Sequence, residues 1–335
     1  MRPARALPES LGNRFSIRDA REAGVSRGRL HRSDLAKPFR GTRSIPSPIA
    51  VAVAVAVAGQ DPFARQAAER RERARDYAPL LRPGQFFSHE TAVALWGGPL
   101  RLVTTASGRG HGAPEPVEGR TLPVHVSTFG DGPLVRAAGV RGHRADPAKA
   151  HAMLSDGMLV STPATMFAQL GAWSLSDLVA LGDFLCRVWR PGFGRPDVGR
   201  SPLSSIDELR TTVAGTRWMN VRRLRAALDL VREDSWSPRE SRLRVQLVLA
   251  GLPEPLLNQD VYDDHGRFLA CVDLAYPHLK IAIEYQSMLH HSRYAADVER
   301  IAALRAAGWT VIEVTSDLLS RPDALIGRVS DALHR

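Results

Sequence analysis

The chain has 335 residues, of which 44% are apolar and 24% charged, a composition typical of globular proteins that excludes a mostly disordered chain. Its two cysteines, Cys186 and Cys271, exclude a disulfide-stapled scaffold and a four-cysteine zinc site. The longest apolar run, residues 49–58, is much shorter than the about 20 residues of a membrane span. The N-terminus also lacks the apolar segment of a signal peptide, so we expect a cytoplasmic protein without membrane contacts.

Basic residues are concentrated near the N-terminus. The whole chain has 45 basic and 35 acidic residues, a net charge of +10, while residues 1–75 contain 16 of the basic and 7 of the acidic ones, a net charge of +9. A locally basic segment most often meets nucleic acid. A GC-rich coding sequence is the alternative source of the many arginines, although it does not explain their uneven distribution.

Residues 14–43 predict a small helical module. A short helix at 18–23, a glycine-containing turn and a second helix at 27–35 form the helix-turn-helix pattern. The N-terminal end of the second helix would enter the major groove of DNA, and its free N–H groups suit a phosphate. The predicted DNA-contacting residues are Ser26, Arg27, Arg29 and Arg32. Any two-helix corner with a glycine turn gives a similar pattern, so a purely structural role stays open.

The central part of the chain mixes helices with a low-complexity stretch. Residues 50–58 alternate alanine and valine, and we assign no chemistry to them. The charged helix expected at 64–78 has the mixed signs of a solvated face. The other expected elements are helices at 89–96, 161–173, 174–187, 205–214 and 218–232, a strand at 124–127 and a linker at 190–204. The middle domain is therefore predicted to be mixed and mostly helical.

From Ser237 onward the sequence predicts the order α-β-β-β-α-β-α. The expected elements are a helix at 237–250, strands at 256–262, 267–276 and 279–286, a helix at 294–307, a strand at 309–315 and a helix at 322–333. Asp273 and Glu284 lie within otherwise apolar strands. A lone buried carboxylate is costly unless it is paired or bound to a metal, so these two residues are candidates for a site.

This order of elements, with its acidic positions, resembles the PD-(D/E)XK nuclease superfamily, and more closely the domain related to very-short-patch repair endonucleases. The segments that carry the resemblance are SPRESRLR (237–244), VDLAYP (272–277), IAIEYQ (281–286), the pair His290-His291, DVER (297–300) and AAGWTVIEVT (306–315). The resemblance implies a restriction-endonuclease-like fold and metal-dependent hydrolysis of DNA. Asp273 and Glu284 would then hold Mg²⁺ or Mn²⁺, and Glu240 would be the acidic residue of the first helix.

The chain departs from the family at one position. Gln286 stands where the family often has a lysine that orients the attacking water, and glutamine can hydrogen-bond water but cannot act as a base. His290 and His291 are alternative bases, or else exposed loop residues. Two structural explanations also stay open, in that Glu240 completes a capping box with Ser237 and Asp297 pairs with Arg300.

The front of the chain resembles the AbiEi-type antitoxin regulators. The resemblance rests on the helix-turn-helix pattern and on the segments SHETAVALWG (88–97) and STPATMFAQLGAW (161–173). It implies DNA binding and leaves a cognate toxin open as a partner. No small-molecule organic cofactor is expected.

The sequence thus predicts a multidomain protein of α+β or α/β class. Its expected segments are a helix-turn-helix module at 1–45, the Ala/Val stretch and charged helix at 46–80, an AbiEi-like α+β domain at 81–190, a linker and helical connection at 191–234 and a PD-(D/E)XK nuclease-like domain at 235–335. Two functions follow. The first is a metal-dependent DNA endonuclease, and the second is a DNA-binding transcriptional regulator or antitoxin with a degenerate nuclease-like domain. The residue at position 286 separates them.

Overall fold

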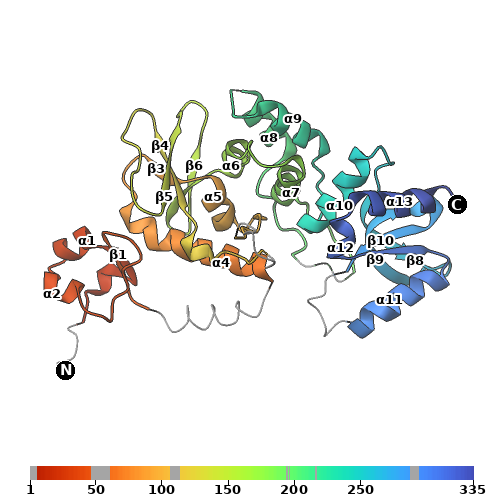
Figure 1. The fold of residues 1–335 in the computed structure, drawn as a ribbon, viewed down its shortest axis with the longest axis horizontal. Coiled ribbons are helices and arrows are strands. Elements are labelled where there is room, and N and C mark those ends of the chain that lie inside the picture. The colour runs from red at the N-terminus through yellow and green to blue at the C-terminus, as the bar shows by residue number, and fades with distance from the viewer. Residues whose placement is uncertain are drawn as a thin grey trace. The chain divides into compact units, whose positions relative to one another are not determined.

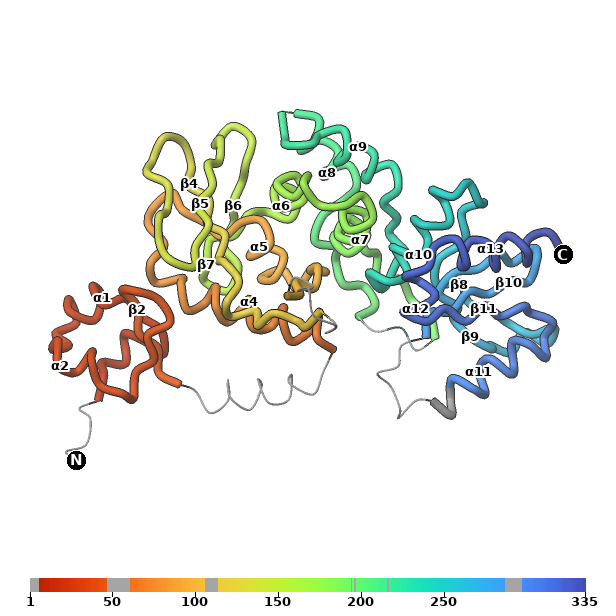
Figure 2. Tube along the Cα trace, in the orientation of Figure 1, coloured from red at the N-terminus to blue at the C-terminus, as the bar shows by residue number. Residues whose placement is uncertain are grey.

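The chain folds into two compact units, Met1–Gln169 and Leu170–Arg335, and both mix helices with sheets (Figures 1 and 2). The computed structural model describes residues 6–46, 61–105, 114–193, 195, 197–215, 217–286 and 294–335. The Ala/Val stretch at 50–58 lies outside these residues. No helix in the described ranges combines the length and apolar character that crossing a membrane requires. The boundary between the units falls inside the segment 81–190, and the finer division into five segments remains a prediction.

The N-terminal module pairs two short helices with a two-stranded antiparallel sheet. Its elements are a 3-10 helix (Glu9–Leu11), β1 (Arg14–Ser16), α1 (Ile17–Glu22), α2 (Arg27–Leu30) and β2 (Thr42–Ser44). Each α-helix begins at a serine cap, because Ser16 Oγ accepts from Asp19 N at 3.0 Å and Ser26 Oγ accepts from Arg29 N at 3.3 Å. Phe15, Ala20, Leu30 and Leu35 form a small buried core.

The expected helix at 27–35 is wrong in length, since α2 is a single turn that ends at Leu30. The buried side chain of Arg43 explains the early end. Its Nε donates to Leu30 O at 2.6 Å, which satisfies one of the carbonyl groups that a helix leaves open at its C-terminus. The chain then turns, and Ala36 bridges to Ser44 beside the two-stranded sheet.

The charged helix α4 (Pro62–Tyr77) is not the solvated helix that its composition predicts. The side chain of Gln66 is buried and donates to Val103 O at 2.9 Å and to Val117 O at 2.7 Å. Arg14 of the N-terminal module donates to Asp76 Oδ1 at 2.9 Å and also pairs with Glu72. Polar and charged side chains of α4 therefore make contacts within the first unit. Those of Glu72 and Asp76 hold the N-terminal module against the rest of that unit.

A five-stranded sheet forms much of the remainder of the first unit, where the sequence predicted one strand, so the middle domain is mixed as predicted but contains more strands. The strands run in the order β5-β4-β3-β7-β6. The elements are 3-10 helix Ala78–Leu80, β3 (Gln85–Phe87), α5 (His89–Trp96), 3-10 helix Gly119–Thr121, β4 (Val124–Phe129), β5 (Val140–Ala145), β6 (Ala152–Ser155), β7 (Met158–Ser161) and α6 (Pro163–Gln169). Parallel pairing of β4 with β5 sets His125 opposite Arg141 and Ser127 opposite His143.

The second unit begins with helices that pack together before its sheet. These are α7 (Leu175–Cys186), α8 (Ile206–Ala214), α9 (Val221–Leu230) and α10 (Pro238–Leu249). A buried ion pair joins α7 to α10, because Arg244 Nη2 lies 3.1 Å from Asp183 Oδ2 and both side chains are at most 1% exposed. Helix α10 thus packs against α7 and also against the sheet that follows it.

The C-terminal hundred residues follow the order predicted from the sequence, with two extra short helices, one of them a 3-10 helix. The elements are β8 (Leu256–Tyr262), β9 (Phe268–Tyr276), 3-10 helix Pro277–Leu279, β10 (Ile281–Tyr285), α11 (Tyr294–Ala306), β11 (Thr310–Val314), α12 (Ser316–Leu319) and α13 (Pro322–Leu333). The sheet order is β11-β10-β9-β8, parallel between β10 and β11 and antiparallel elsewhere. Apolar residues of α10 and α13 pack against one face and those of α11 against the other (Figure 1).

Candidate active site

Asp273 and Glu284 come from neighbouring antiparallel strands of the C-terminal sheet. Strands β9 and β10 are joined by one short 3-10 turn, and the register that pairs Ile283 with Leu274 places Glu284 beside Asp273. Asp273 Oδ2 accepts a hydrogen bond from the backbone N–H of Tyr285 at 2.8 Å. Glu284 is the residue before Tyr285 and is only 3% exposed. The local sequence thus brings two carboxylates together inside an apolar sheet.

Glu240 adds a third acidic group from the first turn of α10. Ser237 caps this helix by accepting from Glu240 N at 3.2 Å, and Pro238 occupies the first helical turn. The Glu240 carboxylate is buried and accepts from Trp236 N at 2.9 Å and from the side-chain amide of Asn258 at 2.8 Å. The predicted cap is confirmed, with the return bond reaching the residue before Ser237.

The three carboxyl groups influence one another electrostatically. Burial, and then the charge of Asp273, raises the pKa of Glu240 to about 7. Burial, and then the charge of Glu284, raises the pKa of Asp273 to about 7. Burial also raises the pKa of Glu284 to about 7, against the opposing effect of Arg300. Like charges held in a low-dielectric site resist full ionisation, so the three carboxyl groups do not all ionise readily at neutral pH.

Arg300 of α11 is the counter-charge within this site. Its Nη1 lies 2.9 Å from Glu284 Oε1, and its Nη2 lies 3.4 Å from Asp297 Oδ1. The predicted pairing of Asp297 with Arg300 is confirmed, but the same guanidinium also serves Glu284. The approach to Glu284 Oε1 lacks hydrogen-bond geometry, which leaves this buried oxygen without a hydrogen bond.

Three residues were expected to orient or deprotonate the attacking water. Gln286 follows the end of β10 and donates its backbone N–H to Val314 O at 2.8 Å, and its side chain is partly exposed. His290 and His291 lie outside the described residues, so their place relative to Glu284 remains a prediction.

The sequence did not point to a second cluster of titratable side chains, which lies in the first unit. His89, His125 and His143 place ligand atoms within 4.8 Å of one another, and among the described residues they form the one such group of three or more His, Cys, Asp or Glu. The acidic trio of the second unit is therefore more widely spaced than these histidines. The three positions are far apart in sequence, and only the pairing of β4 with β5 brings two of them together.

The predicted nucleic-acid-binding residues lie at the start of α2. Ser26 and Arg27 are exposed, and Arg29 and Arg32 are partly exposed. Arg29 forms a two-pronged ion pair with Asp34, with Nη1–Oδ1 and Nη2–Oδ2 distances of 3.0 and 2.8 Å. The helix expected to contact DNA is therefore shorter than predicted, a single turn, and the Arg29 guanidinium is already engaged.

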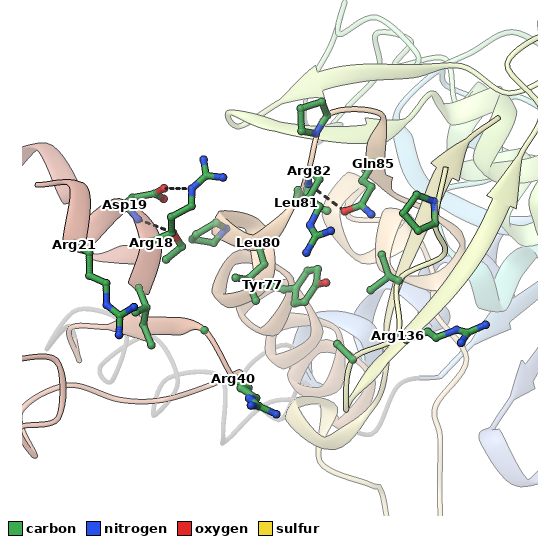
Figure 3. A pocket seen from close by; sticks show the side chains of 18 of the residues that line it. Arg18, Asp19, Arg21, Arg40, Tyr77, Leu80, Leu81, Arg82, Gln85 and Arg136 are labelled. Carbon is green, nitrogen blue, oxygen red and sulfur yellow. Dashed lines mark hydrogen bonds and ion pairs between the residues drawn. The ribbon is translucent and has the colours of Figure 1, made fainter. Parts of the chain in front are cut away.

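Other arginines of the first unit surround a pocket of about 840 Å³. Its lining joins residues of α1 to those near the end of α4 and to the segment before β5. Figure 3 shows the five arginines of this lining, Arg18, Arg21, Arg40, Arg82 and Arg136. Asp19 and Glu22 lie in the same lining, and Arg18 Nε is 3.4 Å from Glu22 Oε1. The surplus of arginines gives this surface a positive charge.

Comparison with known proteins finds partial relatives. Two uncharacterized proteins of Mycobacterium tuberculosis, from strains CDC 1551 / Oshkosh and ATCC 25618 / H37Rv, are each 34% identical to the chain over 103 residues. The matched part is 30% of this chain and 38% of each relative, so the chain spans well under half the length of the curated relatives it matches. No protein-family model and no solved structure matches the chain.

Proposed function

We propose that this protein is a metal-dependent DNA endonuclease whose C-terminal hundred residues hydrolyse a phosphodiester bond. The observation that carries the proposal is the meeting of Asp273 and Glu284 on neighbouring strands, linked through the bond from Tyr285 N to Asp273 Oδ2 at 2.8 Å. Glu284 is buried and Asp273 is partly buried, and two such neighbouring carboxylates are costly unless a cation compensates them. The order of elements in residues 235–335, which resembles the PD-(D/E)XK superfamily, supports the same reading.

The donor set suits a hard divalent cation. Mg²⁺ takes oxygen ligands, usually one or two carboxylates together with water and phosphate. Asp273 and Glu284 would hold it, and Arg300 Nη1, which lies 2.9 Å from Glu284 Oε1, would have to give up that oxygen to the cation. Once bound, the cation would neutralise charge on the phosphate and lower the pKa of an attacking water.

The neighbouring side chains have distinct roles in this proposal. Arg300 keeps Glu284 ionised and, being partly exposed, can donate to a non-bridging phosphate oxygen. Gln286 orients water by hydrogen bonding but carries no proton away. Glu240 is held by Trp236 N and Asn258, so it acts through its charge on Asp273. The base is left to a histidine after position 286 or to solvent.

The arginine-lined pocket of the first unit supports DNA binding by the front of the chain. Phosphate groups are held mainly by arginine and lysine side chains, and a concave surface with five arginines in its lining is suited to a nucleic-acid backbone. Arg27 adds an exposed positive charge on the same module. This module would supply affinity, because residues 235–335 contain 11 basic and 13 acidic side chains, a net charge of −2.

A DNA-binding regulator is the second candidate function. Two observations favour it, namely the glutamine at position 286 and the ion pair that already occupies Glu284 Oε1. In this alternative Arg300 replaces the cation and the site stabilises the fold. DNA binding by the first unit would then be the whole activity, with a cognate toxin as a further candidate partner.

Cleavage of supercoiled plasmid by the purified full chain separates the two functions. We expect nicking in the presence of Mg²⁺ or Mn²⁺ and its loss in EDTA. Single-stranded and mismatched duplex DNA should be tested in parallel, because the target structure is open. Well-folded protein that binds DNA but cleaves none of these substrates with either metal would refute the endonuclease and favour the regulator.

A further inference from the structure

Three histidines converge at one point of the first unit. His125 lies on β4, His143 on β5 and His89 at the first position of α5. His125 Nδ1 is 2.9 Å from His143 Nε2, and the rings of His89 and His143 stack with centroids 3.8 Å apart. His125 is 7% exposed and the other two are partly buried. The cluster is thus an internal feature with a partly open side.

A carboxylate lies beside the histidines. Glu90 Oε2 is 3.4 Å from His125 Nδ1, outside the group of ligand atoms that lie within 4.8 Å of one another. Three imidazoles form a donor set that suits zinc and related divalent ions. We propose that His89, His125 and His143, with Glu90 beside them, bind one divalent transition-metal ion of the zinc class. This site is separate in sequence and in structural unit from the carboxylates of the proposed nuclease.

The backbone at His89 is held in an unusual conformation. His89 has a φ of +50°, in the left-handed region that a non-glycine residue rarely adopts and only with strain. Ser88, the residue before it, caps α5 without a side-chain hydrogen bond to the helix. Its hydroxyl instead lies 3.0 Å from His89 Nδ1 and accepts from Ser127 Oγ at 2.8 Å. The surroundings therefore keep the His89 ring directed into the cluster.

The hydrogen bond of Ser88 assigns the atoms of His89. A metal-bound histidine commonly uses its second ring nitrogen for a hydrogen bond that fixes the ring. With Nδ1 of His89 bonded to Ser88, Nε2 is the nitrogen left for a ligand. His125 is fixed at its backbone, where its N–H donates to Thr91 Oγ1 at 2.8 Å. Both residues thus have the supporting contacts that a metal site requires.

The cluster presents lone pairs rather than positive charge. A distance of 2.9 Å between His125 Nδ1 and His143 Nε2 accommodates only one proton between the two nitrogens. Burial, followed by the neighbouring histidines, lowers the pKa of His89 to about 2. The same causes lower the pKa of His143 to about 4, and burial lowers that of His125. Neutral imidazoles bind metals, whereas an anion would need them protonated.

Charged groups around the cluster act in both directions. The charge of Arg141 lowers the pKa of all three histidines, and the charge of Arg70 lowers the pKa of His125. The charge of Glu90 has the opposite effect, because it raises the pKa of His125 and of His143. It also raises the pKa of Arg70. The negative charge of Glu90 beside His125 would limit the repulsion between a bound ion and these arginines.

Binding requires modest movement of the rings. With Zn–N distances of about 2.0–2.1 Å, the nitrogens of a tetrahedral site lie about 3.4 Å apart. The observed ligand atoms span distances from 2.9 Å to at most 4.8 Å. The stacked rings of His89 and His143 would have to fan apart, because a metal lies in the plane of each imidazole that binds it. Side-chain rotation provides this movement without a change in the sheet.

Calorimetric titration of the metal-free, untagged full chain with Zn²⁺ tests the proposal. We expect one site per chain in addition to the carboxylate site proposed above, and its affinity should fall more than about 100-fold in His143→Asn, with a smaller fall of about 10–100-fold in Ser88→Ala, which keeps every ligand. His151→Asn is the matched control, since this exposed histidine of the same unit lies outside the cluster. Asp273→Asn should also leave the site intact, which separates it from the proposed nuclease metal. Bound Co²⁺ should give a visible spectrum that disappears in His143→Asn.

Three results would overturn the proposal. The first is the absence of Zn²⁺ binding, and the second is Zn²⁺ affinity unchanged in both His143→Asn and Ser88→Ala. The third is binding of inorganic phosphate that both variants abolish, because it would identify an anion site. Thermal unfolding of each variant identifies misfolding, and Ser88→Ala keeps the test valid if His143→Asn fails to fold.

Discussion

Arg300 Nη1 lies 2.9 Å from Glu284 Oε1, so that an arginine of α11 neutralises the most buried carboxylate of the candidate active site. The pair links α11 to β10 and places a positive charge where the proposed metal would sit. Arg300 is partly exposed, whereas Glu284 is 3% exposed. Glu284 therefore depends on Arg300 for its charge, while Arg300 has a second partner in Asp297.

Removing Arg300 should destabilise the protein most at high pH. In Arg300→Ala, Glu284 would be left as an unpaired buried charge, and we expect the free energy of unfolding at pH 8 to fall by about 2 kcal/mol. This is below the 3–5 kcal/mol typical of a fully buried pair, because Arg300 is partly exposed. Denaturant unfolding of wild type, both single variants and Arg300→Ala/Glu284→Gln measures the coupling. Additive losses in the double variant would contradict the pairing.

Asp273 should make the fold less stable above neutral pH. Its folded pKa of about 7 is raised above the unfolded value of about 3.8, so the penalty is absent below pH 4, grows as the carboxyl ionises in the unfolded but not in the folded state, and is complete above pH 7. Asp273→Asn should therefore raise the melting temperature at pH 8 in metal-free buffer and leave it unchanged at pH 4. Asp264→Asn, in an exposed turn, is the control. An equal change at both pH values would contradict the raised pKa.

The ion pair between Asp183 and Arg244 should be essential to the second unit. Both side chains are at most 1% exposed, so Asp183→Ala leaves a buried guanidinium with only Glu254 as a charged partner. We expect a loss of about 3 kcal/mol in unfolding free energy, or roughly 6–12 °C in the melting temperature of this unit. Thermal unfolding measures it, with the exposed Asp207→Asn as control. A decrease in melting temperature of less than 2 °C would show that the ion pair between α7 and α10 contributes little to the stability of the second unit.

DNA affinity should depend more on Arg27 than on Arg29. Arg27 is exposed, whereas Arg29 is held by Asp34. If Arg27 contacts a phosphate, Arg27→Ala should flatten the dependence of log K on log salt by about 0.9, and Arg29→Ala should flatten it less. Binding of labelled duplex at several salt concentrations gives both slopes. Unchanged affinity and slope in Arg27→Ala/Arg32→Ala would mean that DNA does not contact this helix.

The C-terminal part of the fold could be predicted because its signals are local. Ser237 and Pro238 mark the start of α10, and Gly251, with a φ of +80°, follows its end. Gly266, with a φ of +76°, closes the turn between β8 and β9. Caps and turns of this kind depend on neighbouring residues alone. The same local reading placed Asp273 and Glu284 on adjacent strands.

The front of the chain was predicted less well because distant contacts decide its structure. Arg43 ends α2 from 13 positions away, which no helix propensity could indicate. Strand β5 contains arginines and a glycine and carries no strand pattern of its own, yet it pairs with β4 along its whole length. The Asp156-Gly157 turn between β6 and β7, with φ values of +47° and +74°, was a hairpin signal in the sequence that would have indicated more strands.

The contact between Arg300 and Glu284 and the histidine cluster could not be predicted from the sequence. Arg300 was expected to pair only with Asp297, because those residues are one helical turn apart, and its contact with Glu284 requires the packing of α11 on the sheet. The cluster of His89, His125 and His143 likewise requires the parallel register of β4 and β5. Such contacts follow from tertiary structure, which periodicity does not encode.

The most direct test of the proposed endonuclease compares plasmid nicking by wild type, Asp273→Asn and Glu284→Gln with Mn²⁺. Asp264→Asn and Glu299→Gln, both exposed and in the same unit, are the matched controls. The proposal predicts nicking by wild type and both controls, and a loss of at least 100-fold in each site variant. Nicking that persists in both site variants, or its absence in folded, DNA-binding wild type, would contradict a metal-dependent nuclease at Asp273 and Glu284.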